Sequence, residues 1–121
     1  MELRQAPAIE GYGGGGFRVQ GEWISGSTLI LGDVARPWPV AALAELTPEA
    51  FAPVLAEGAA AVEFVLLGVG ASMAPPPKTV REALHAAGLG LEVMDTPAAC
   101  RLYNVLAQDG RRVAAALIAA P

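Results

Sequence analysis

The chain has 121 residues, of which 54% are hydrophobic, and this length suits one compact domain with a core of its own. Its formal net charge of −4 excludes the basic face that binding to nucleic acid requires. One cysteine and one histidine exclude an internal disulfide and supply too few soft ligands for a zinc, iron or copper site, so we expect neither a metal nor another cofactor.

The sequence contains no recognisable targeting segment or membrane span. Residues 1–11 have no basic region followed by an apolar run, so we expect no signal peptide. The most apolar stretch, residues 59–74, is interrupted by Glu63 and is too short to span a bilayer. We therefore expect a cytoplasmic protein that does not insert into a membrane.

Residues 11–31 favour strands and turns. The run STLIL at 27–31 and the β-prone Trp23 predict strands, and Gly21 and Gly26 predict the turns that separate them. We expect a small antiparallel β meander at the N-terminal end of the fold.

A glycine-rich stretch, GYGGGG at 11–16, opens this region and matches the pattern of dinucleotide-binding loops. Such a loop requires a strand before it and a helix after it. The sequence FRVQGEW that follows is strand-like, so the stretch predicts a bent loop and not a cofactor site. Further along, Pro37 and Pro39 exclude a central strand at their positions.

The rest of the chain alternates between helical and strand patterns. The expected elements are a helix opened by Thr47 and closed by Gly58, a strand at 62–67, a helix from Lys78 to Gly88, a strand at 91–94, a helix opened by Thr96 and closed by Gly110, and a strand at 112–118. This alternation predicts a single α/β domain over residues 1–121, with flanking helices around a mixed, largely parallel central sheet.

Polar residues gather where two of the expected strands end. One helical crossover joins the strands at 62–67 and 91–94, so they should run parallel, with their carboxyl ends at the same edge of the sheet. The backbone N–H groups of the loop at 68–72 favour weak binding of an anionic ligand there, and so does the amino end of the helix opened by Thr96. The candidate ligand-binding residues are Gly68, Gly70, Ser72, Asp95, Thr96, Arg101 and Asn104.

A plainer interpretation of the same stretch remains open. The loop at 68–72 is then a close turn, and Asp95 is a helix cap instead of an acid in a site. The helix itself would bury an apolar stripe made of Ala98, Leu102, Val105 and Leu106. No catalytic residues are assigned, and Cys100 is interpreted as a small buried side chain because no base lies near it in sequence.

Trp38 lies between two prolines and has two open interpretations. An exposed tryptophan favours an interface, so Trp38 is a candidate contact with a protein partner. The alternative, held equal, is a lid over the hydrophobic core.

Four motifs follow one another across nearly the whole chain: GYGGGGF, LLGVGA, MDTPAACRLYNVL and DGRRVAAALI. In these motifs the chain resembles the small domain family of unknown function that includes mitochondrial complex I assembly factor 3 and the adipogenesis-associated Mth-type domain protein. The resemblance implies a three-layer α/β fold with a central mixed sheet, in which the final strand can run antiparallel to its neighbours. It brings no established catalytic residues.

For function, the resemblance implies a non-enzymatic interaction protein that binds a protein partner and assists assembly of a membrane-associated respiratory complex. The chain lacks the targeting extension of the mitochondrial members, which indicates a stand-alone bacterial relative. The alternative function is a domain that binds a small molecule or anion, with or without catalysis, in a pocket at the strand ends near 68–72 and 95–104.

Overall fold

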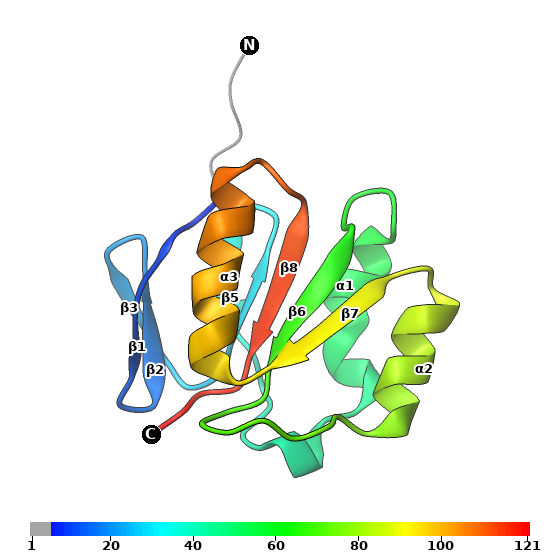
Figure 1. Ribbon diagram of the computed structural model, residues 1–121, viewed down its shortest axis with the longest axis horizontal. Helices are drawn as coiled ribbons and strands as arrows, with labels where there is room; N and C mark the ends of the chain where they lie inside the picture. Colours follow the sequence, from blue (N-terminus) through cyan, green and yellow to red (C-terminus); the bar gives the residue numbers. More distant parts are fainter. Residues whose placement is uncertain (1–5) are drawn as a thin grey trace.

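The computed structural model describes residues 6–121, which form a mixed α/β fold of three layers (Figure 1). The central sheet consists of β4 (Thr28–Leu31), β5 (Val34–Pro37), β6 (Phe64–Gly68), β7 (Gly90–Met94) and β8 (Val113–Leu117), in the order β5-β4-β8-β6-β7. A second, antiparallel sheet consists of β1 (Ile9–Gly13), β2 (Gly16–Val19) and β3 (Glu22–Ser25). The helices are α1 (Ala52–Glu57), α2 (Lys78–Ala86) and α3 (Thr96–Gln108), with short 3-10 turns at Leu43–Glu45 and Pro48–Phe51.

The central sheet is mixed, as the resemblance implied. Strand β6 is parallel to both β7 and β8, whereas β4 is antiparallel to β8 and β5. The final strand β8 is therefore parallel to one neighbour and antiparallel to the other. The expected three layers, the flanking helices and the small N-terminal meander are confirmed (Figure 1).

A separate hydrophobic cluster lies against each face of the central sheet. Along β6, Val65 and Leu67 pack into one cluster and Leu66 into the other, because successive side chains of a strand point to opposite faces. The first cluster includes α1 and α2, and the second includes α3 and the inner face of the β1-β2-β3 sheet. A fully buried leucine stabilises the fold by about 1.5–3 kcal/mol. In a strand that is buried on both faces, nearly every side chain therefore contributes to the stability of the fold.

The run at 27–31 does not belong to the meander, and this expectation is corrected. Residues 28–31 form β4, which pairs with β8 inside the central sheet. Leu29 and Leu31 pack into one cluster and Ile30 into the other, so the strand needs cover on both faces. The following strand β5 is an edge strand, where Pro37 at its end is tolerated.

The helix expected from Thr47 is broken into two parts. A 3-10 turn at Pro48–Phe51 precedes the short α1, and the Thr47 side chain makes no capping hydrogen bond. Pro53 explains the break, because its missing N–H and its ring are acceptable only in the first turn of an α-helix. The α-helix therefore begins at Ala52, immediately before this proline.

The buried stripe of α3 was predicted in part. Leu102 and Leu106 are partly buried and pack against the second cluster, as expected, whereas Val105 is 57% exposed. The fully buried residues of this helix are Thr96, Ala99, Cys100 and Tyr103. Asp95, not Thr96, is the N-cap, and the Thr96 side chain is buried, which sets the rotation of the helix. Within residues 6–121, no helix has the length and apolar character needed to cross a bilayer.

Candidate functional site

The structure brings the two predicted strand ends together. Gly68 at the end of β6 is in register with Met94 at the end of β7, and the strands are parallel. The loop after β6 therefore lies beside the start of α3, at one edge of the sheet (Figure 1). We call Gly68, Gly70, Asp95 and Thr96 the strand-end junction.

Thr96 is the centre of this junction and is fully buried. Its hydroxyl oxygen accepts from the N–H of Gly70 at 2.9 Å and donates to the carbonyl oxygen of Ile118 at 2.7 Å. Its own N–H donates to the carbonyl oxygen of Gly70 at 2.8 Å. The hydroxyl thus joins the loop after β6, the start of α3 and the end of β8.

Gly68 is required by the close approach of Thr96. A Cβ atom at position 68 would lie 2.9 Å from the Thr96 hydroxyl oxygen and 3.0 Å from its Cα atom. Any side chain at this position would push α3 away from β6. The glycine of the LLGVGA motif is therefore explained by packing.

Asp95 caps α3. Its carboxylate accepts from the N–H of Ala98 at 2.8 Å, the usual contact of an N-cap side chain. The carboxylate also places negative charge at the positive end of the helix. Two of the donors expected to hold an anion, the N–H groups of Gly70 and Ala98, are thus engaged inside the fold, which does not favour the ligand hypothesis. Ser72 is exposed on the same loop.

Asn104 and Arg101 face β1 and not the strand-end junction. The Asn104 side-chain oxygen accepts from the N–H of Ile9 at 2.9 Å, and its amide nitrogen donates to the carbonyl oxygen of Ile9 at 2.8 Å. Arg101 donates to the hydroxyl of Tyr12 at 3.2 Å. Asp95 and Asn104 are nine positions apart, or about 14 Å along a helix, so the predicted set does not converge on one pocket.

Cavities occur elsewhere in the molecule. One of about 190 Å³ is bordered by Val62 and Arg112, and another of about 240 Å³ by Val19 and Val34. Neither is bordered by the residues of the strand-end junction.

Trp38 belongs to the core, so the interpretation as a partner contact is corrected. Its side chain is 4% exposed and packs edge-on against Phe51, with 5.4 Å between ring centroids. Its indole N–H donates to the carbonyl oxygen of Ala50 at 2.8 Å. A buried indole usually finds such a partner, and this one covers the core as a lid.

Cys100 is buried in the cluster beneath α3. Burial raises the pKa of its thiol to about 12, because a thiolate would lose its hydration there. The thiol is therefore a poor nucleophile at neutral pH. Among residues 6–121, no three His, Cys, Asp or Glu side chains are grouped so as to hold a metal ion.

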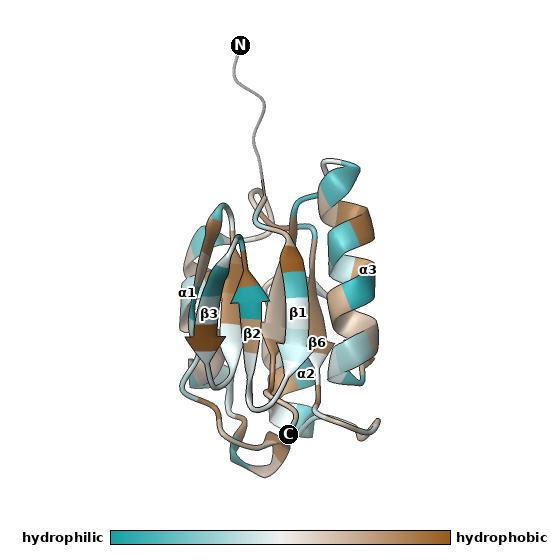
Figure 2. Ribbon diagram, turned by 90° about the vertical axis from the view of Figure 1, so that its left-hand side faces the viewer, coloured by the Kyte–Doolittle hydropathy of each residue, from teal (hydrophilic) through white to brown (hydrophobic). Residues whose placement is uncertain are grey.

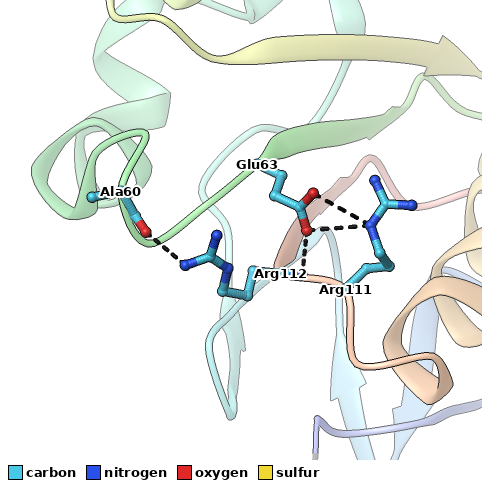
Figure 3. A network of polar contacts seen from close by, with 4 residues as sticks. All are labelled: Ala60, Glu63, Arg111 and Arg112. Carbon is cyan, nitrogen blue, oxygen red and sulfur yellow. Dashed lines mark hydrogen bonds and ion pairs between the residues drawn. The ribbon is translucent and has the colours of Figure 1, made fainter.

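A polar cluster that sequence reasoning missed lies at the opposite edge of the sheet (Figure 3). The Glu63 carboxylate accepts from the Nε of Arg111 at 3.2 Å and from the backbone N–H of Arg112 at 3.0 Å. Arg112 in turn donates to the carbonyl oxygen of Ala60 at 2.8 Å. The Arg111 side chain, followed by the Arg112 backbone, lowers the pKa of Glu63 below its ordinary value. The cluster ties the starts of β6 and β8 together.

Trp23 is the second feature that sequence reasoning missed, because its residue type only indicated a strand. Its side chain is 51% exposed on β3, and its cross-strand neighbour on β2 is Arg18. The other large hydrophobic side chains that are exposed in the described chain are Tyr12, Val34, Met73 and Val105. The alternation of β3 alone does not reveal which of its faces is left uncovered.

Sequence comparisons connect the chain with a family and with named relatives. The family described as "Protein of unknown function (DUF498/DUF598)" matches residues 9–118. An uncharacterized protein of Rhodobacter capsulatus is 40% identical over 117 residues, which cover 93% of this chain and 85% of that protein. Human NADH dehydrogenase [ubiquinone] 1 alpha subcomplex assembly factor 3 is 32% identical over 121 residues, which cover 99% of this chain and 65% of that protein.

Solved structures confirm the fold. A Bartonella henselae protein described as an outer membrane protein has a TM-score of 0.88 and 30% identity, covering 99% of this chain and 100% of that one. A Mth938-like domain from Bordetella pertussis has a TM-score of 0.79 and 28% identity, covering 98% and 92% of the two chains.

Proposed function

The chain belongs to the DUF498/DUF598 family of proteins of unknown function, and we propose that it is a non-enzymatic interaction protein that assists assembly of a membrane-associated respiratory complex. The observation that carries this proposal is the match to human NADH dehydrogenase assembly factor 3 over 99% of this chain. The chain spans 65% of the length of that relative, so the relative's role enters here as a proposal.

The way in which the chain uses its polar residues supports a surface role. The side chains of Thr96 and Asp95 form hydrogen bonds with backbone groups of the fold, and Asn104 holds β1 against α3. Trp23 and Arg18, in contrast, are exposed cross-strand neighbours on the outer face of the small sheet. Such side chains dominate the energetics of many protein interfaces.

We place this activity in the bacterial cytoplasm, next to the membrane in which the respiratory complex is built. The Bartonella henselae neighbour, described as an outer membrane protein, defines the competing location. Fractionation of cells that produce the chain separates the two. Recovery with the cytosol and inner membrane supports the proposal, and recovery with the outer membrane contradicts it.

Deletion of the gene in its host tests the proposed function. We expect the amount of assembled NADH:quinone oxidoreductase on native gels to fall while its subunit transcripts remain constant. Re-expression of the chain should restore the assembled complex. An unchanged level of assembled complex in the deletion strain would contradict the proposal.

A further inference from the structure

Strand β7 forms one edge of the central sheet, and β6 is its only partner among the described strands (Figure 1). The carbonyl oxygen of Met94 accepts from the N–H of Val69, which follows β6, so the backbone groups of Met94 face β6. The N–H and C=O groups of successive residues point to alternate sides of a strand, so those of Leu91 and Val93 point away from β6. Within residues 6–121 these outward groups have no hydrogen-bond partner.

The other sheet edges are blunted or occupied by the fold itself. At β5, Trp38 donates to the carbonyl of Ser27 on the β4 side, so the missing N–H of Pro37 is on the outer side, where an added strand would need it. At β1, α3 lies alongside the strand (Figure 2), and the Asn104 side chain makes two hydrogen bonds with the backbone of Ile9. The edge of β3 contacts β5. The β7 edge has neither a proline nor a side chain that binds its outward groups.

The side chains of β7 are also less covered than those of the strands inside the sheet. All five residues of β8 and four of the five in β6 are buried, whereas Leu91, Val93 and Met94 on β7 are half-buried. Leu91 and Val93 pack against the cluster that includes α1 and α2, and Met94 packs against the cluster beneath α3. A strand added beside β7 would cover the apolar surface that these side chains leave open, which favours its binding.

Glu92 decides which segment this edge accepts. It is exposed in the middle of β7 and forms no ion pair with another residue in the described part of the chain. A second copy that paired antiparallel with both Leu91 and Val93 would place its own Glu92 directly opposite this one. Like charges in such a position destabilise a strand pair, and opposite charges stabilise it. The edge therefore favours a different chain with a basic residue at this position over a second copy.

We propose that β7 is extended by a segment of a protein partner, which pairs with Leu91 and Val93 through main-chain hydrogen bonds and carries a basic residue opposite Glu92. The residues on either side of that basic residue are apolar, because they lie beside Leu91 and Val93. In such strand addition the main chain supplies affinity and the alternating side chains supply specificity. The net charge of −4 also favours a basic segment. The inference rests on the proposed function and deepens it by assigning an edge and a partner chemistry.

A titration followed by NMR tests this edge in the full ¹⁵N-labelled chain. The probe is a short blocked peptide that alternates valine with lysine. We expect the backbone N–H signals of Leu91 and Val93 to move and their exchange with solvent to slow, because these groups gain acceptors. The indole signal of Trp38 is the internal control and should not move, because that N–H is bonded to Ala50 inside the core. A peptide that alternates valine with glutamate should bind about tenfold more weakly, because its glutamate faces Glu92.

Two variants at one position test the main-chain pairing. Val93→Pro removes an outward N–H without breaking a hydrogen bond to β6, so the edge strand tolerates it. It should weaken binding of the lysine peptide by about tenfold, because the peptide loses a hydrogen bond and meets the proline ring. Val93→Ala shortens the same side chain but keeps the N–H, and its binding should stay within about threefold of the wild type.

Two charge variants test the selection by Glu92. Glu92→Lys should weaken binding of the lysine peptide by about tenfold and strengthen binding of the glutamate peptide. Glu22→Lys makes the same change of net charge at an exposed position of β3, in the other sheet, and should alter binding by less than about twofold. An unshifted indole signal of Trp38 shows that each variant is folded.

Several outcomes would overturn the proposal. They are the absence of shifts at Leu91 and Val93, equal binding of the lysine and glutamate peptides, and equal binding by Val93→Pro and Val93→Ala. Slower exchange at Leu91 and Val93 that depends on protein concentration alone would assign the edge to a second copy and would overturn the proposal as well. If peptide binding fails but gene deletion lowers the assembled complex, then only the assignment of the β7 edge is wrong. If peptide binding succeeds without a deletion phenotype, then the respiratory role is wrong.

Discussion

The strand-end junction and the outer face of the β1-β2-β3 sheet make opposite use of residues that are commonly associated with function. At the junction, the hydroxyl of Thr96 and the carboxylate of Asp95 are turned inward and satisfied by backbone groups. On the outer face of the small sheet, the cross-strand neighbours Arg18 and Trp23 are exposed. The difference teaches that the dense polar motif of this chain holds the fold together, while the exposed pair on the small sheet is not used by the fold in this way.

The two tryptophans give the largest contrast between inside and outside. Trp38→Ala should lower the free energy of unfolding by about 4 kcal/mol, because it empties a core position and leaves the carbonyl of Ala50 without its donor. Trp23→Ala should cost less than about 1 kcal/mol, since half of its side chain is already in water. Urea denaturation measures both. Equal losses would contradict the exposed position of Trp23.

Thr96→Val tests the junction directly. The substitution keeps the shape of the side chain but leaves the N–H of Gly70 and the carbonyl of Ile118 buried without this partner, so we expect a loss of about 2–4 kcal/mol. The control Thr79→Val changes an exposed threonine of α2 and should stay within about 0.5 kcal/mol of the wild type. A small loss for Thr96→Val would mean that its hydroxyl is free for another use.

Asp95→Ala should have a smaller effect. It removes the side-chain cap of α3 and should lower the free energy of unfolding by about 1 kcal/mol. Asp109→Ala, at the other end of the same helix, is the matched control, because a carboxylate near a helix C-terminus does not stabilise it. If Asp95→Ala left stability unchanged or raised it, the carboxylate would be strained in the fold, as an acid held for a reaction would be.

Glu63 gives a pH dependence whose sign follows from its lowered pKa. The carboxylate is stabilised in the folded state by Arg111 and Arg112, so its contribution is present above the pKa of an ordinary glutamate and is lost as the pH falls through the lowered value. The stability difference between the wild type and Glu63→Gln should therefore shrink below about pH 4. Chemical denaturation over this range checks it, with Glu82→Gln on α2 as the control. A difference that grows on acidification would contradict the contacts drawn in Figure 3.

The smallest effect is expected for anions at the strand ends. Because Gly70 and the first turn of α3 already use their N–H groups, phosphate and small carboxylic acids should leave the melting temperature unchanged. A ligand at 100 times its dissociation constant would stabilise the fold by about 2.7 kcal/mol, which a thermal shift assay detects easily. A rise in the melting temperature with any of these anions would contradict this expectation.

Sequence reasoning predicted the fold better than the site, for physical reasons that particular residues illustrate. The strands β6 and β8 were found because buried parallel strands are continuous apolar runs. The placement of β4 was missed, because its pairing with β8 joins residues that lie far apart in sequence. The most buried positions of α3 were missed because Thr96, a polar residue, is the first of them.

The site was harder to predict because it depends on which surfaces remain uncovered. The carboxyl ends of β6 and β7 were correctly predicted to lie together. The hydrogen-bond partner of Thr96, the carbonyl of Ile118, could not be predicted from any local pattern, because the two residues lie far apart in sequence. Trp38 carries no sign in its neighbours that Phe51 and Ala50 enclose it. Trp23 likewise gives no local sign that Gly16 supports its ring, since the two residues lie on neighbouring strands.

Complementation of the deletion strain tests most directly the claim that the chain assists assembly of a respiratory complex. The wild-type chain is produced in that strain, and the amount of assembled NADH:quinone oxidoreductase is measured on native gels. The account predicts a reduced amount of complex in the deletion strain and its restoration by the chain. An amount that the deletion leaves unchanged would contradict the account.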